Sequence, residues 1–69
     1  MAALTADRAF AIKARLHTVR MALVAAIEII LECDRTQDVI RADLELHQAL
    51  RHTAMAAGIV ANEEAASDA

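Results

Sequence analysis

The chain has 69 residues, with one cysteine, one glycine, no proline and a formal net charge of −3 at pH 7. A chain of this length forms at most one domain, and it buries too little surface to be very stable alone. The single cysteine excludes an internal disulfide and no CxxC or CxxH spacing indicates a zinc site, so oligomerisation is the expected source of stability.

The charges are spread unevenly along the chain. Up to residue 61, seven Lys and Arg balance seven Asp and Glu, and the remaining tail adds three acids. A neutral body disfavours nucleic acid as the partner, because proteins that bind it usually carry a basic excess. The longest apolar run, residues 21–31, has eleven residues and includes Glu28, so it is too short to cross a membrane. A single thiol without a signal-peptide pattern favours the cytoplasm.

Apolar residues recur at helical spacing and strand signals are absent, which predicts an all-α fold. The first helix is expected over residues 5–32, with Thr5 as its N-cap. Asp34 and Gln37 have the spacing of a capping box, which predicts a turn at about residues 33–36, and Thr36 is the rival cap. The second helix is expected over residues 36–61, and the acidic segment 62–69 is expected to be disordered.

One unbroken helix is the alternative, because the predicted turn contains neither Gly nor Pro. The apolar row of the first helix becomes half polar when it is continued past Cys33, and a better row begins in a different phase at Val39. This phase break favours an antiparallel hairpin in which paired residue numbers sum to about 69. The predicted hairpin core consists of Ile12, Leu16, Val19, Leu23, Ile27, Ile30, Val39, Ala42, Leu46, Ala49, Leu50 and Thr53.

The first helix carries a second row at heptad spacing, expected on roughly the opposite face. Its members are Phe10, Ala14, His17, Met21, Val24, Glu28 and Leu31. An antiparallel second copy would place Met21 against Val24, and the two polar members, His17 and Glu28, against each other. The row therefore predicts a homodimeric four-helix bundle with a coiled-coil-like interface. Exposure of the row to solvent, or its cover by a different helical protein, is the alternative.

Few residues are candidates for catalysis or metal binding. Asp43 and His47 lie four apart, which favours an ion pair on the helix surface, extended by Arg51, over a metal site, since two ligands are too few. No Ser or Cys nucleophile stands near a base, and there is no Gly-rich phosphate loop or Glu-x-x-His motif. We therefore predict no catalytic residue, cofactor or metal, and a protein that is not an enzyme. Cys33 is interpreted as a small hydrophobe.

Two helices, a tight turn without Gly or Pro, an acidic tail and an antiparallel dimer together resemble the Rop-like plasmid regulators that bind RNA. This resemblance implies an RNA-binding homodimer, although Phe10 is the only aromatic residue for such a surface. The segments Gln48-Ala-Leu-Arg and Gly58-Ile-Val are similar to the hairpin co-chaperones of type III secretion needle subunits, which implies pairing with a different helical protein. The residues themselves favour a small non-catalytic interaction module (adaptor, small chaperone or inhibitor) that acts as a homodimer.

Overall fold

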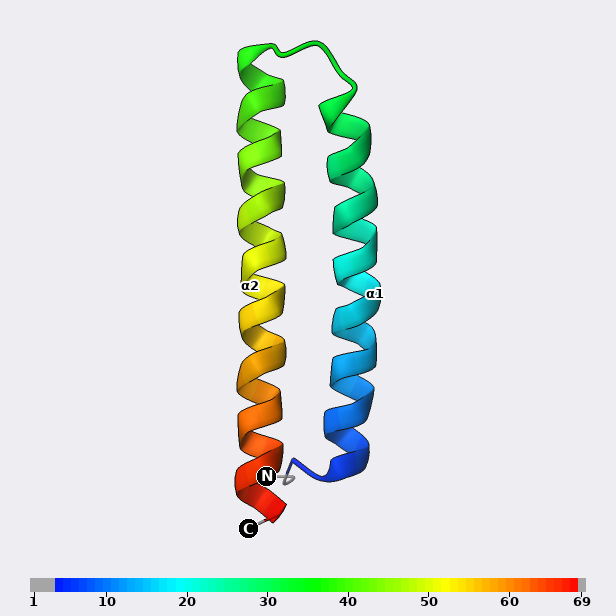
Figure 1. The fold of residues 1–69 in the computed structure, drawn as a ribbon, viewed down its shortest axis with the longest axis vertical. Coiled ribbons are helices and arrows are strands. Elements are labelled where there is room, and N and C mark those ends of the chain that lie inside the picture. The colour runs from blue at the N-terminus through cyan, green and yellow to red at the C-terminus, as the bar shows by residue number, and fades with distance from the viewer. Residues whose placement is uncertain (1–3, 69) are drawn as a thin grey trace.

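The structure is a computed structural model that describes residues 4–68, with the side chains of residues 4–66. Two helices account for most of this range: α1 (Ala6–Leu31) and α2 (Gln37–Asp68). They run antiparallel and pack against each other, joined by a short connection at one end (Figure 1). The predicted all-α hairpin is thereby confirmed, and the single unbroken helix is excluded.

Helix α1 begins and ends as its local sequence requires. Thr5 is the N-cap, as predicted, and its Oγ1 accepts a hydrogen bond from the backbone N–H of Arg8 at 3.3 Å. This bond satisfies one of the N–H groups that the first helical turn leaves without a partner. At the other end, the backbone N–H groups of Glu32 and Cys33 each donate to a carbonyl three residues earlier, at 3.1 Å. The helix thus tightens into a 3₁₀ turn before the chain reverses.

The N-terminus of α2 is not capped by the predicted capping box at Asp34. Thr36, the rival candidate, caps α2, because its Oγ1 accepts from the backbone N–H of Val39 at 3.2 Å. The carbonyl of Asp34 instead accepts from the backbone N–H of Thr36 at 2.8 Å. Within the described residues no φ angle is positive, so the chain reverses without needing a glycine. The turn lies where it was expected, and of the two caps that the sequence left open the structure has Thr36.

The residues that face the other helix form one heptad row on each helix, which we call the packed seam. On α1 the packed seam contains Ala9, Lys13, Leu16, Arg20, Leu23, Ile27 and Ile30. On α2 it contains Val39, Asp43, Leu46, Leu50, Thr53, Ala57 and Val60. All of these are buried or half-buried except Arg20, whose side chain lines a pocket between the helices. Three of the fourteen positions are therefore charged.

Four members of the predicted core lie outside the packed seam, and six members of the packed seam were not predicted. Eight of its members are buried or half-buried: Leu16, Leu23, Ile27, Ile30, Val39, Leu46, Leu50 and Thr53. The other four, Ile12, Val19, Ala42 and Ala49, are exposed. The predicted rows were chosen for apolar residues, so they passed over the charged positions 13, 20 and 43 and took the uncharged neighbours beside them. Each predicted row is therefore rotated about the helix axis, by about half of the turn that one residue makes, away from the true contact face.

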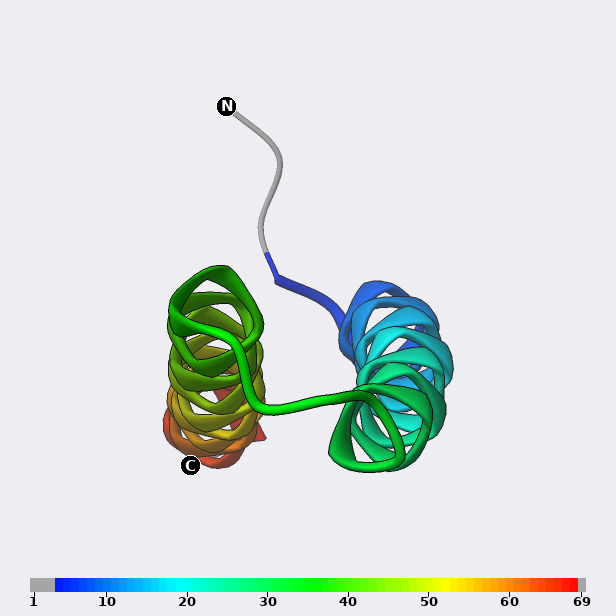
Figure 2. The ribbon, with the colours of Figure 1, turned by 90° about the horizontal axis from the view of Figure 1, so that it is seen from above.

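A hairpin of this shape has little interior. Its radius of gyration is 15.7 Å, whereas a compact domain of this length has a radius of about 11 Å. It exposes 5384 Å² of accessible surface, against about 4,200 Å² for a typical folded monomer of the same mass. Among the described residues only Ala9 and Ile27 are buried, at 0% and 8% exposure. Viewed along the helices, the described chain is a single layer with two broad faces (Figure 2).

The predicted disordered tail is corrected by the structure, which continues α2 through Asp68. The Nζ of Lys13 lies 2.6 Å from a carboxylate oxygen of Glu64, so the C-terminal part of α2 is tied to the N-terminal part of α1. The alanines at 61, 65 and 66 have high helix propensity, and no proline interrupts them. The acidic composition concealed this helical signal. Position 69 of the predicted tail lies outside the described residues.

Candidate protein-interaction surface

Large apolar side chains lie exposed on both helices. They are Phe10, Ile12, Val19, Met21, Ile29, Leu31, Ile40, Leu44, Met55 and Ile59. Phe10, the only aromatic residue, is 73% exposed. Single exposed apolar residues are ordinary, but ten of them on one small hairpin make its surface suited to association.

The predicted interface row occupies one flank of α1. Each of its members directly follows a residue of the packed seam; for example, His17 follows Leu16 and Glu28 follows Ile27. One residue turns an α-helix by about 100°, so the row lies roughly at right angles to the packed seam. The prediction that the row lies on the opposite face of the helix is therefore wrong. All members of the row are exposed except the half-buried Val24. A right angle is the arrangement of a four-helix bundle, where each helix contacts two neighbours.

The matching row of α2 falls on the same side of the hairpin. Because the helices are antiparallel and face each other, residues that follow the packed seam point to one broad side on both helices. On α2 these residues are Ile40, Leu44, His47, Arg51, Ala54, Gly58 and Ala61, and all of them are exposed. We call the two rows together the apolar face. Among its fourteen residues, Glu28 and Arg51 are the only Asp, Glu, Lys or Arg.

The opposite broad side, which we call the charged face, is more polar. Its rows precede the packed seam by one residue: Arg8, Ile12, Arg15, Val19, Ala22, Ala26 and Ile29 on α1, with Asp38, Ala42, Glu45, Ala49, His52, Ala56 and Ile59 on α2. Four of these residues are Asp, Glu or Arg, twice the number on the apolar face. The core of a protein interface is depleted in charged residues. The apolar face is therefore the better candidate for association.

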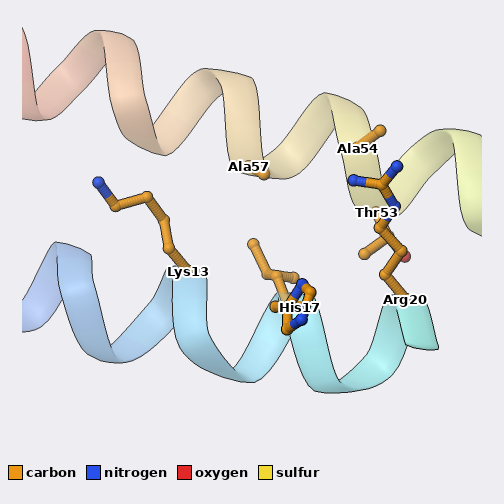
Figure 3. A pocket seen from close by; sticks show the side chains of 7 residues that line it. Lys13, His17, Arg20, Thr53, Ala54 and Ala57 are labelled. Atoms are coloured by element: carbon orange, nitrogen blue, oxygen red, sulfur yellow. The ribbon is translucent and has the colours of Figure 1, made fainter. Parts of the chain in front are cut away.

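A pocket opens on the apolar face between the two helices (Figure 3). It has a volume of about 200 Å³ and is lined by Lys13, Leu16, His17 and Arg20 from α1 and by Thr53, Ala54 and Ala57 from α2. Small residues on α2 make room for it, and basic side chains border it on α1. That Leu16 and Thr53 line the same pocket agrees with the predicted pairing of these two residues. Lys13 and Arg20 were not predicted as site residues, because their only signal in the sequence is their heptad spacing.

The basic groups at the pocket differ in their partners. Lys13 is paired with Glu64 within the chain. Within the described residues, neither His17 nor Arg20 forms an ion pair, and neither does Glu28. His17, Arg20 and Glu28, all on α1, thus lack an ion pair within the described residues. This pattern is what an interface between charged groups of two molecules requires.

A second polar cluster stabilises the end of the hairpin near the turn. The Asp43 side chain is 14% exposed, and one of its carboxylate oxygens accepts from Arg35 at 3.1 Å. The other oxygen lies 3.1 Å from Nδ1 of His47, but that nitrogen is better aligned with the Asp43 carbonyl, at 2.9 Å. The oxygen therefore lies beside the His47 ring without a well-formed hydrogen bond. The predicted contact between Asp43 and His47 is present, and the cation that pairs with Asp43 is Arg35 from the turn in place of Arg51.

No group of three His, Cys, Asp or Glu side chains in this part of the chain is placed to hold a metal ion. Cys33 is exposed at the end of α1, with its Sγ 3.5 Å from the carbonyl oxygen of Ile29. Neither helix, over the residues described, is both long and apolar enough to span a bilayer.

Comparison of the chain with protein-family models, with curated protein sequences and with solved structures finds no match.

Proposed function

We propose that this protein is a non-catalytic interaction module that works as a homodimer, with the apolar faces of two hairpins joined in a four-helix bundle. The observation that carries the proposal is the shortage of interior: the described part of the hairpin buries only Ala9 and Ile27 and exposes ten large apolar side chains. Its surface exceeds that of a typical monomer by about 1,200 Å². A standard interface buries about 800 Å² per partner, so a dimer on one broad face would remove about two thirds of this excess.

Self-complementarity favours a second copy over a different protein. A two-fold interface places each residue against a counterpart on an identical surface. In the α1 row, an antiparallel pairing about the middle of the helix opposes Met21 to Val24 and His17 to Glu28. Ala14 likewise opposes Leu31, so the pairing forms two apolar pairs and one polar pair, and only Phe10 lies beyond the paired stretch. Neither member of the polar pair, His17 or Glu28, has an ion pair within the described residues of its own chain. A contact with an unrelated protein would not require this internal symmetry.

The RNA-binding alternative finds less support in the surface. The basic residues of α1 are divided, since Arg8 and Arg15 belong to the charged face while Lys13 and Arg20 border the pocket. Arg15 shares the charged face with Asp38 and Glu45. Binding to a phosphate backbone is favoured by a continuous basic surface. We therefore place the function in protein contact.

The proposal predicts that unfolding depends on chain concentration, because each dimer yields two unfolded chains. Thermal unfolding, followed by circular dichroism over about a hundredfold range of concentration, is expected to give a Tm that rises steadily with concentration. A Tm that is constant over the whole range would contradict the homodimer.

A further inference from the structure

We infer that the pocket between α1 and α2 is a socket for the Glu28 carboxylate of the partner subunit, held between His17 and Arg20. This inference rests on the proposed homodimer and names the contact that fixes its register. At this pocket two basic groups without an intrachain ion pair, His17 and Arg20, border a hollow of about 200 Å³.

The position of Glu28 follows from the pairing of the α1 rows. An antiparallel partner centred between Ala22 and Leu23 brings its residue 28 level with His17 and its residue 25 level with Arg20. Residues 25 and 28 are three apart, about 4.5 Å along a helix, which a long arginine side chain spans. A carboxylate at this level therefore has an imidazole on one side and a guanidinium on the other. Arginine and carboxylate form strong, directed hydrogen bonds.

The α2 side of the pocket supplies space and an apolar wall. Ala54 and Ala57 line it, so a side chain from the partner can enter without displacing a larger residue. Figure 3 shows the side chains of Lys13 and Arg20 extending from α1 toward α2, with His17 between them on α1 and Ala54 and Ala57 on α2. A polar contact enclosed in an apolar interface specifies register more than it adds stability. The socket thus selects one alignment of the two hairpins.

A charge exchange tests the socket. His17→Glu alone and Glu28→Lys alone each place like charges together at both symmetric contacts, and each is expected to raise the dimer Kd by about tenfold. The double variant restores opposite charges and is expected to return the Kd to within about threefold of the wild-type value. Sedimentation equilibrium measures the Kd, and circular dichroism checks that each variant is helical. The exposed pair His52→Glu and Glu45→Lys, on the charged face, is the matched control and is expected to leave the Kd unchanged.

A filling substitution tests the same socket without altering a charge. Ala54→Leu occupies the hollow and is expected to weaken the dimer by about tenfold, whereas Ala42→Leu on the charged face leaves it unchanged. If the wild-type chain is dimeric and the two single charge variants retain its Kd, or the double variant combines both losses, the socket is wrong while the homodimer stands. If the wild-type chain is monomeric, both are wrong.

Discussion

Met21→Glu is expected to abolish the dimer and leave monomeric chains with much less helix. Met21 is 54% exposed in the hairpin and lies at the middle of the α1 row, opposite Val24 in the proposed dimer. A carboxylate there would be desolvated against an apolar side chain, close to Glu28, at two symmetric positions. We expect a loss of at least about 3 kcal/mol of association free energy, which weakens the Kd by more than about a hundredfold. Sedimentation and circular dichroism at the same chain concentration measure the two effects.

Met55→Glu is the matched control for this substitution. Met55 is 56% exposed, almost the same as Met21, but it belongs to neither the apolar face nor the packed seam. The same chemical change at this position is expected to leave both mass and helix content unaltered. A Met21→Glu chain that remains fully dimeric would show that the α1 row is not the interface.

Ile27→Ala is expected to produce the largest loss from within one hairpin. Ile27 is the most buried large side chain in the described range, at 8% exposure, and it sits in the packed seam between Leu23 and Ile30. Removing a buried isoleucine side chain costs about 2–5 kcal/mol, because the transfer energy is lost and a cavity remains. Folded small proteins have total stabilities of only about 5–15 kcal/mol, so much of the chain should unfold at moderate temperature. Urea unfolding at a fixed chain concentration measures the loss.

Ile29→Ala is the matched control for Ile27→Ala, because it removes the same side chain from an exposed position. Ile29 belongs to the charged face and is 66% exposed, so the same truncation is expected to cost less than about 1 kcal/mol. Equal losses at positions 27 and 29 would show that the packed seam described above is not the contact between the helices.

Much of the fold could be predicted because its signals are local. Thr5 caps α1 through its own hydroxyl, and the phase break at the turn is a property of adjacent residues. The rotation of the seam could not be predicted from apolar periodicity. Lys13 can occupy a seam position because it pairs with Glu64, which is distant in the sequence. Asp43 can do so because it pairs with Arg35, which lies in the turn. A charged residue in a seam becomes tolerable only when its partner is known.

The tail and the pocket also depend on contacts between distant residues, which the sequence pattern does not reveal. Segment 62–69 looks disordered by composition, yet a single contact from Glu64 to Lys13 ties it to a helix that begins far away in the chain. The pocket combines basic residues of α1 with alanines of α2, and neither group stands out alone. The flank position of the α1 row could have been inferred from the sequence, since each member follows a seam residue, but only after the seam itself was correctly placed.

The mass of the wild-type chain in solution is the most direct test of the central claim. Sedimentation equilibrium over a range of concentrations is expected to give a species of twice the 7.4 kDa chain mass, in reversible exchange with a smaller population of single chains. The same measurement on Met21→Glu is expected to give the single-chain mass. A wild-type chain that stays at 7.4 kDa while retaining full helix content would contradict the account, because the exposed apolar face would then be stable without a second copy.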